Sequence, residues 1–457
     1  MEDHDETLGR RNFLGIMGAG AAVSAAALVG CGHAGRGSKG GQGAEVPTDR
    51  MSYRTDPKTG QRVSLLGYGC MRLPKVPKPD ATGDTDKIDQ EAVNASVDYA
   101  LAHGINYFDT SPRYCRGQSE HAMGLALSRH PRDRYLIATK MSNFEAKSRE
   151  ESLEMYRNSL RELRVDYLDY YLVHAVGNYK TYKERYLDNG VLDFMLKERE
   201  AGRIRNLGWS FHGEKAFFDY MMSCGVKWDF VLIQSNYFDW KSALGSSNVN
   251  AKYLYDELVR LNVPAMIMEP LLGGRLARPH HKAQMLLKQA DPAASIASWA
   301  FRFAGSMPNV LTVLSGMTFV EHMQDNIRSF SPLKPLTGSE NALLDRVAEI
   351  MVKYPNINCT NCQYCMPCPY GIDIPGVFGH YNRCLNEGDF PDNAQDPSFR
   401  QARRAFLVGL DRSVPRLRQA QHCTGCGICL KRCPQSIHIP DEMQRIDRFA
   451  EQLRVTG

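Results

Sequence analysis

The sequence lacks several features that would point to common classes of protein. Its net charge of +5 is small for 457 residues, and it has no arginine-rich run and no platform of aromatic residues. These absences argue against nucleic acid as a partner. The apolar segment from Ile16 to Gly30 has fifteen residues, fewer than the roughly 20 that span a bilayer. A chain of this length exceeds one ordinary core, so two or three units are expected.

The first part of the chain has the pattern of a targeting segment. Two arginines in GRRNFLG (9–15) precede the apolar segment, which resembles a twin-arginine export signal. Its last residues, LVGC (28–31), resemble a lipobox, which implies lipidation at Cys31; an uncleaved anchor helix is the alternative. We assign residues 1–31 to the signal and the Gly-rich residues 32–50 to a flexible linker. The expected location is the periplasm or cell envelope, with a lipid anchor.

Residues 51–335 repeat a short apolar run followed by an amphipathic helical stretch. Near-continuous apolar runs are typical of parallel strands buried on both faces, and eight such units match the size of a (β/α)₈ TIM barrel. An open doubly wound sheet is the alternative, but no GxGxxG follows the first run. Residues 51–65 ahead of the barrel are expected to form a hairpin that closes its bottom. The eight runs are 63–69, 105–109, 135–140, 167–174, 204–210, 230–235, 264–269 and 309–315.

Polar residues lie at the ends of three of these runs. Asp109 ends the second run and Tyr114 follows five residues later, Lys140 ends the third, and His174 ends the fourth. Catalytic groups of such barrels lie at the C-terminal strand ends, so these residues are expected to meet. An ammonium beside a phenol lowers the phenol's pKa, so Lys140, held by Asp109, would prime Tyr114 to protonate a carbonyl oxygen. His174 would donate a hydrogen bond to that oxygen.

The motifs FDTSPRY (108–114), ATK (138–140) and YLVH (171–174), in this order, resemble those of the aldo/keto reductases. The resemblance covers roughly residues 51–335. It implies carbonyl–alcohol interconversion with a nicotinamide cofactor and a catalytic tetrad of Asp109, Tyr114, Lys140 and His174. LGYGCMRLP (66–74) also resembles the family's first strand, which implies that Met71 and Arg72 lie near the nicotinamide.

The cofactor side of the resemblance is less complete. Ser210 and Gln234 match family positions, and Asn326 is kept after the eighth strand, but Phe211 stands where Asn is usual. Met268 replaces the stacking Tyr. The cofactor-binding positions implied by the resemblance are Met71, Arg72, Ser210, Gln234, Met268, Ser315, Gly316 and Asn326.

The clamp for the 2′-phosphate of NADPH is also altered. Gly316 and His322 stand where Lys and Arg usually bind this phosphate, so a strong preference for NADP is not expected. Ser315 and Gly316 still offer backbone N–H groups to a phosphate. Three readings stay open: NADH in place of NADPH, a flavin at the barrel mouth, or weak nucleotide binding with electrons from elsewhere.

Eight of the thirteen cysteines form two runs near the C-terminus. The second run has the C-x₂-C-x₂-C-x₃-C-P spacing of bacterial ferredoxins, and the first differs from it by one residue. The spacing predicts two [4Fe–4S] clusters, with zinc or disulfides as alternatives. Ligands of such clusters cross over, so the fourth cysteine of each run would bind the other cluster. The two predicted sets are Cys359, Cys362, Cys365 with Cys433, and Cys423, Cys426, Cys429 with Cys368.

We assign residues 336–457 to a small α+β dicluster ferredoxin-like domain. A helical insertion, 376–420, separates the cysteine runs and includes Cys384, which is an alternative to Cys368 as a ligand but is expected to be packed. The twin-arginine route carries folded proteins, so clusters acquired in the cytoplasm would survive export.

The sequence therefore predicts an iron–sulfur oxidoreductase of aldo/keto reductase type. Its electrons would come from a nicotinamide cofactor, the clusters, or both. Because a nicotinamide transfers two electrons and a cluster one, a direct link needs a two-electron carrier such as flavin. The expected partners are a small carbonyl or alcohol substrate, a redox protein and the membrane. The alternative function is an electron-transfer subunit whose barrel serves as a docking module without carbonyl chemistry.

Overall fold

The computed structural model describes residues 45–76, 87–145, 148–241, 249–391 and 393–455. The predicted signal and Cys31 lie outside these residues, as does most of the predicted linker. In the described part of the chain, no helix is long and apolar enough to cross a membrane.

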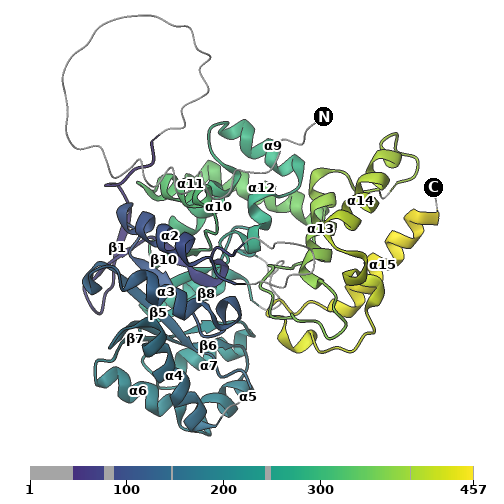
Figure 1. Ribbon diagram of the computed structural model, residues 1–457. Coiled ribbons are helices and arrows are strands. Elements are labelled where there is room, and N and C mark those ends of the chain that lie inside the picture. The colour runs from purple at the N-terminus through teal and green to yellow at the C-terminus, as the bar shows by residue number, and fades with distance from the viewer. Residues whose placement is uncertain (1–44, 77–86, 146–147, 242–248, 392, 456–457) are drawn as a thin grey trace, which may run out of the picture.

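Eight parallel strands close into a barrel (Figure 1), which confirms the predicted (β/α)₈ fold and excludes the open sheet. The strand order is β10-β3-β4-β5-β6-β7-β8-β9. Each of the eight apolar runs in the sequence overlaps one of these strands. Their bounds are β3 Leu66–Gly69, β4 Tyr107–Asp109, β5 Leu136–Met141, β6 Leu168–Val176, β7 Ile204–Phe211, β8 Phe230–Gln234, β9 Ala265–Met268 and β10 Val310–Ser315.

A hairpin of β1 (Tyr53–Thr55) and β2 (Arg62–Ser64) precedes the barrel, as the sequence predicts. Asp56 in its turn accepts a 2.5 Å hydrogen bond from the hydroxyl of Tyr170. Tyr170 belongs to a core inside the barrel that also contains Tyr107 and Phe230. The hairpin therefore closes the bottom of the barrel and leaves the opposite end, where the strands finish, as the open mouth.

The helices that follow the strands cover the outside of the barrel (Figure 1). Their apolar faces and the outer faces of the strands form one large core. The helices are α2 Gln90–Ala102, α3 Ser119–Leu127, α4 Arg149–Leu163, α5 Tyr179–Tyr182, α6 Val191–Glu200, α7 Lys215–Ser223, α8 Ala251–Arg260, α9 His281–Ala290, α10 Ile296–Gly305 and α11 Val320–Phe330. Short turns lie between them: η1 Cys70–Arg72, η2 Tyr114–Gly117, η3 Arg132–Arg134, η4 Lys183–Leu187 and η5 Leu272–Ala277.

Helix α12 (Gly338–Lys353) corrects the predicted domain boundary at 335. Its buried residues Leu344, Val347 and Met351 belong to the barrel core, not to the core of the cysteine-containing domain. Next to its end, the ring of Tyr354 stacks on His280 with 3.7 Å between ring centroids. The boundary between the two cores therefore follows Met351, because the apolar face of α12 packs on the barrel.

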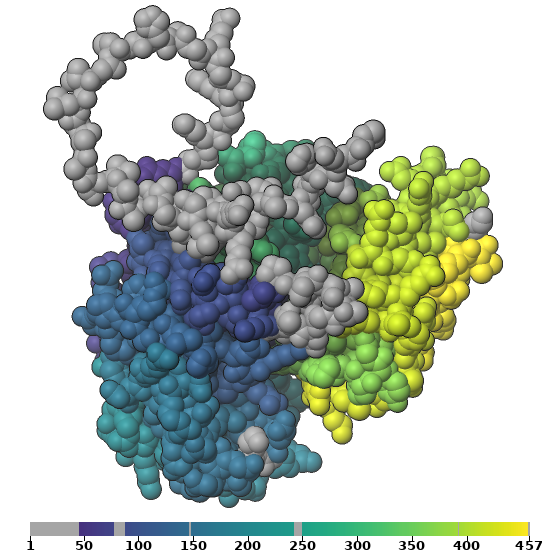
Figure 2. Space-filling model, in the orientation of Figure 1, coloured from purple at the N-terminus to yellow at the C-terminus, as the bar shows by residue number. Residues whose placement is uncertain are grey.

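The C-terminal domain has its own core, which begins at Ile357. Three helices supply most of this core: α13 (Ile374–Glu387), α14 (Phe399–Ser413) and α15 (Ile439–Val455). The first two occupy the predicted helical insertion. The sequence predicts an α+β domain here, whereas the described residues from 355 to 455 form helices, short turns and cysteine loops without a strand. The domain lies beside the barrel as a second body (Figures 1 and 2).

Candidate active site

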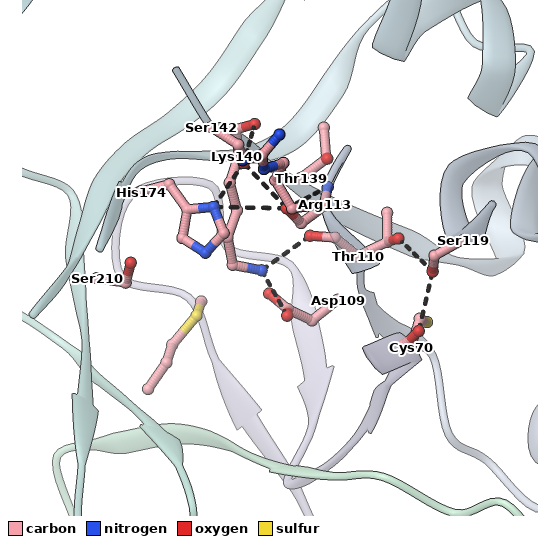
Figure 3. Close-up of polar contacts among 12 residues, drawn as sticks. Cys70, Asp109, Thr110, Arg113, Ser119, Thr139, Lys140, Ser142, His174 and Ser210 are labelled. Atoms are coloured by element: carbon pink, nitrogen blue, oxygen red, sulfur yellow. Dashed lines mark hydrogen bonds and ion pairs between the residues drawn. The ribbon is translucent and has the colours of Figure 1, made fainter. Parts of the chain in front are cut away.

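The strand ends at the barrel mouth bring the predicted catalytic residues together. Lys140 Nζ lies 2.6 Å from Asp109 Oδ1 and donates a second hydrogen bond, of 2.8 Å, to the carbonyl of Thr110 (Figure 3). Lys140 is 1% exposed and Asp109 is 3% exposed. Burial raises the pKa of the Asp109 carboxyl, and the neighbouring Lys140 opposes this shift. The pair is a buried, charge-assisted contact in which each partner requires the other.

His174 is fixed by hydroxyl groups on the neighbouring strand ends. Its Nδ1 lies 2.5 Å from the Ser142 hydroxyl (Figure 3). The same nitrogen lies 3.4 Å from the Ser111 hydroxyl. Burial lowers the pKa of His174 well below its ordinary value, and the positive charge of Lys140 adds to this effect. The imidazole is therefore neutral near pH 7, and these contacts at Nδ1 orient the ring.

Tyr114 lies in turn η2, next to Lys140 and His174. Lys140 Nζ is 4.8 Å from the centroid of its ring, and the ring lies edge-on to His174 at 6.1 Å. The expected lowering of the phenol pKa by Lys140 is wrong. Burial raises the pKa of Tyr114 well above its ordinary value, and the carboxylate of Asp109 raises it further, because Asp109 offsets the charge of Lys140. The phenol is therefore protonated and is positioned to act as a proton donor.

One cavity of about 1520 Å³ extends over the tetrad. The barrel side of its wall includes Tyr114, Lys140 and His174. The opposite wall comes from the C-terminal domain, through residues 360–364 and 431–435. The cavity therefore lies between the barrel mouth and the cysteine loops, and the two domains together form one site.

The predicted cofactor positions divide into two groups. Met71, Arg72, Ser210 and Met268 line the cavity. Gln234 does not: its amide donates to Asp239 Oδ2 at 2.9 Å and accepts a 3.3 Å hydrogen bond from Gln435 of the C-terminal domain. The structure thus brings four of the eight positions to the tetrad.

Of the other three positions, Ser315 and Gly316 lie at the end of strand β10 and Asn326 lies in helix α11. The amide of Asn326 donates a 2.9 Å hydrogen bond to the hydroxyl of Ser315, and both side chains are buried. Gly316 packs under the side chain of Arg72, whose Cδ would be 3.2 Å from a Cβ at this position. In the described part of the chain, the cavity wall does not include Ser315, Gly316 or Asn326.

The first cysteine loop is docked on the barrel mouth by three contacts. The guanidinium of Arg72 donates to the carbonyl of Thr360, and Arg275 donates a 2.9 Å hydrogen bond to Asn358 Oδ1. Gly273 has a positive φ of 68°, and a Cβ at this position would lie 2.3 Å from Thr360 Cα. Because Gly273 has no side chain, the backbone of the cysteine loop can approach η5, the turn that follows strand β9.

The first predicted set of cluster ligands converges in the structure. Cys359, Cys362, Cys365 and Cys433 line one small cavity inside the C-terminal domain. Burial raises the pKa of the Cys359 thiol to about 11 and that of Cys362 to about 12, and nearby Cys433 raises both further. Four converging cysteines are the donor set of a [4Fe–4S] cluster, so these residues fit the group.

The second predicted ligand set also combines cysteines from both runs. Burial raises the pKa of the Cys429 thiol, and Cys423, Cys426 and Cys368 lie near enough to raise it further. This arrangement brings the last cysteine of the first run to the second run, as the crossover requires. Among the described residues, no three Cys, His, Asp or Glu side chains converge closely enough to bind a single metal ion. That geometry does not match a mononuclear zinc site, and none of the twelve described cysteines forms a disulfide.

Cys384 lies away from both sets. It is buried in the helical core of the C-terminal domain, with its Sγ 3.6 Å from Nε2 of His380. The packed role expected from the sequence fits this position.

Two residues of the cavity were not predicted. Tyr364, between Cys362 and Cys365, lines the cavity and lies near enough to Tyr114 to raise the pKa of that phenol. Glu269 follows strand β9 and faces Arg72, whose charge opposes the rise in its pKa caused by burial. A charged residue at a strand end was the signal that identified the tetrad, and the same signal applies to Glu269. Tyr364 reaches the cavity only because the two domains dock, and no local sequence pattern encodes that docking.

The comparisons with known proteins agree with this geometry. The model of the aldo/keto reductase family matches residues 65–349, and that of the 4Fe-4S dicluster domain matches residues 358–438. The chain belongs to the aldo/keto reductase family. It is an oxidoreductase of this family with a C-terminal 4Fe-4S dicluster domain.

The proteins to which this chain is similar match about two thirds of it. The chain is 27% identical to L-galactose dehydrogenase of Arabidopsis thaliana over an alignment of 340 residues, gaps included, that covers 67% of this chain and 97% of that protein. Aldo-keto reductase AKR11C1 of Bacillus halodurans, in its holo form, has a TM-score of 0.52 at 22% identity and covers 65% of this chain and 96% of its own. An aldo-keto reductase of Klebsiella pneumoniae in complex with NADPH has a TM-score of 0.50 at 21% identity and covers 66% and 95%. These two structures share the barrel fold.

Proposed function

We propose that the protein interconverts a carbonyl and an alcohol at Tyr114 and exchanges the electrons with its own iron–sulfur clusters. The observation that carries this proposal is the single cavity between the tetrad and the cysteine loops. Reduction of the carbonyl takes up two electrons and two protons. The Tyr114 hydroxyl supplies the proton that reaches the carbonyl oxygen, and the alcohol direction returns it. The second proton would reach the carbonyl carbon together with the two electrons, as a hydride from an organic carrier that takes up a proton from solvent when the clusters reduce it again.

The tetrad contributes fixed charges and one mobile proton. The phenol of Tyr114 is protonated, and the neutral His174 ring is held by Ser142 and Ser111 beside it. Lys140, paired with Asp109, places positive charge 4.8 Å from the phenol ring, where negative charge appears once the proton has left. This charge stabilises the phenolate during the reaction, although it does not lower the pKa at rest.

An organic two-electron carrier fits the space above the tetrad. Ligand cavities usually measure about 300–1,000 Å³, so 1520 Å³ leaves room for a carrier together with a substrate. Met71, Arg72, Ser210 and Met268 would hold it at the barrel wall. When bound, a nicotinamide or flavin supplies a hydride to the carbonyl carbon. The NADPH of the Klebsiella pneumoniae structure favours nicotinamide, whereas a flavin would also exchange single electrons.

The cluster-binding cysteines reach the same cavity. Cys362 and Cys433 line both the large cavity and the small one in which the first ligand set converges. A [4Fe–4S] cluster bound there supplies one-electron transfer. Two such clusters hold two electrons, which is the number that one carbonyl requires. The cysteine positions thus support an electron route from the cavity into the C-terminal domain and from there to a redox partner protein.

The test uses the intact protein purified without oxygen. Iron, sulfide and released organic cofactor are measured first. Reduction of benzaldehyde is then followed with NADH, with NADPH and with reduced methyl viologen, which delivers electrons to clusters. The proposal predicts turnover with reduced methyl viologen that disappears in Tyr114→Phe. Turnover with a nicotinamide but none with reduced methyl viologen would contradict the cluster route.

A second function is a docking module without carbonyl chemistry. It is favoured by the contacts that cover the nucleotide side, where Gln435 binds Gln234 and Thr360 lies on Gly273. The same experiment separates the two functions. No aldehyde turnover with any donor, together with reducible clusters, would favour the docking module and an electron-transfer subunit.

We also infer an exported, lipid-anchored protein with residues 1–31 as signal and 32–50 as linker. The paired arginines and LVGC (28–31) support this inference. Replacement of both Arg10 and Arg11 by lysine is expected to keep the protein in the cytoplasm, and Cys31→Ser to release it from the membrane fraction. Equal membrane recovery of wild type and Cys31→Ser would contradict the lipid anchor.

A further inference from the structure

Arginine side chains gather beside the tetrad, around the ring of Phe144. The guanidinium carbons of Arg113 and Arg185 lie 5.4 Å and 5.2 Å from the centroid of this ring. The same ring is 4.9 Å from the imidazole of His174 and 6.2 Å from Tyr364 of the cysteine loop. All five residues line the large cavity. One aromatic ring therefore contacts both His174 of the tetrad and a pair of positive charges.

The two arginines differ in their partners. Arg113 is 3.2 Å from the carboxylate of Glu145. Arg185 is partly buried, and in the part of the chain that the structure describes no carboxylate lies within ion-pair distance of its guanidinium. Burial and the like charge of Arg113 lower the pKa of Arg185, although it stays charged near pH 7. A cation held in this way, without a protein anion, is suited to bind an anionic ligand.

The local backbone supports a role in binding. Arg185 lies in η4 (Lys183–Leu187), a single turn of π-helix directly after α5. Such turns are rare and are frequently found at functional sites. The backbone carbonyl of Arg185 accepts a 2.8 Å hydrogen bond from Asn143, the residue before Phe144. This contact fixes the arginine turn to the loop that carries the aromatic ring.

We propose that the substrate carries a carboxylate that Arg185 binds while the carbonyl lies at Tyr114. One guanidinium without a partner matches one negative charge, so a carboxylate fits better than a doubly charged phosphate. Because Arg185 and His174 both contact the ring of Phe144, at 5.2 Å and 4.9 Å from its centroid, the carboxylate and the carbonyl belong to different ends of one substrate. This inference rests on the proposed function and adds the substrate class to it.

The test compares 4-carboxybenzaldehyde with benzaldehyde as substrates of the intact protein. In Arg185→Gln the ratio of their kcat/KM values is expected to fall about 10- to 100-fold, the loss for a hydrogen-bonded charge pair. Arg185→Lys keeps the charge but loses the planar guanidinium, so its kcat/KM ratio is expected to lie between those of wild type and Arg185→Gln. Arg157→Gln, at an exposed ion pair on α4, is the matched control and is expected to keep the ratio.

A binding measurement keeps this inference separate from the proposed function. Calorimetry with 4-hydroxymethylbenzoate and benzyl alcohol is made on Tyr114→Phe, with and without Arg185→Gln. Tighter binding of the carboxylate that depends on Arg185 supports the inference even if neither aldehyde is turned over, in which case only the proposed function fails. An unchanged kcat/KM ratio in Arg185→Gln, or equal binding of the two ligands, would overturn it.

Discussion

The two sides of the barrel mouth have different partners. On the catalytic side, Lys140 binds Asp109 and the carbonyl of Thr110, and His174 is held by the Ser142 hydroxyl, so contacts within the barrel fix them. On the nucleotide side, Arg72 and Gln234 bind Thr360 and Gln435 of the C-terminal domain. The difference is that contacts within the barrel hold the predicted catalytic residues, whereas two predicted cofactor positions, Arg72 and Gln234, also contact the C-terminal domain.

The largest expected effect is on the catalytic side. Tyr114→Phe removes the proton donor, and kcat for aldehyde reduction is expected to fall about 10²- to 10⁴-fold. The variant keeps the ring that lies over Lys140, so the midpoint of thermal unfolding should stay near that of wild type. Steady-state kinetics and calorimetry measure the two quantities. Tyr167→Phe, whose ring stacks on Arg205 outside the cavity, is the control. Equal losses in both variants would argue against the assigned role.

The next effect is on the cysteine loops that form the opposite wall. Cys359→Ser and Cys433→Ser are each expected to lower the iron content from about eight to about four atoms per chain and to remove the same cluster. Cys368→Ser is expected to remove the other cluster. Iron analysis and electron paramagnetic resonance of the reduced protein distinguish the two clusters. Cys384→Ser, in the helical core, should keep both; loss of one cluster in this variant would identify Cys384 as a ligand.

A smaller effect is expected at the docking contact. Gly273→Ala places a Cβ against the backbone of Thr360, so the two domains must move apart. Gly274→Ala is a close control, because Gly274 also has a positive φ but nothing lies within 4 Å of its added Cβ. The backbone strain of about 1 kcal/mol is common to both variants, and a further loss of stability of about 1–3 kcal/mol should appear only in Gly273→Ala. Chemical denaturation measures the difference, and equal stabilities would show that the contact is loose.

The smallest expected effect is on how the stability of the barrel depends on pH. The pKa of His174 is lowered in the folded state, so below about pH 6.5 the unfolded chain binds the extra proton and stability falls as pH decreases. The loss attributed to this group is about 1 kcal/mol at pH 5.5. All four tryptophans lie in the barrel, so their fluorescence during denaturation reports this domain. His174→Gln should show a flatter dependence between pH 7 and 5.5, and an unchanged slope would contradict a neutral buried imidazole.

Much of the fold follows from the sequence because each strand carries its own signal. The apolar runs and the polar residues that end them are local, so the barrel and the tetrad positions could be derived. The boundary after Met351 could not, because α12 is amphipathic and either core could have buried its apolar face. The raised pKa of Tyr114 was also missed, since it depends on how burial and Asp109 outweigh Lys140. The contacts of Gln234 and Tyr364 arise from domain docking, which no local spacing reports.

The most direct test of the shared cavity is a single-turnover reaction. The protein as purified is reduced without oxygen, separated from the reductant, and mixed rapidly with benzaldehyde while the cluster absorption is followed. We predict reoxidation of both clusters, one molecule of alcohol for every two cluster electrons, and no reoxidation in Tyr114→Phe. Clusters that stay reduced while the same preparation reduces benzaldehyde with a nicotinamide would show that the tetrad and the clusters work separately.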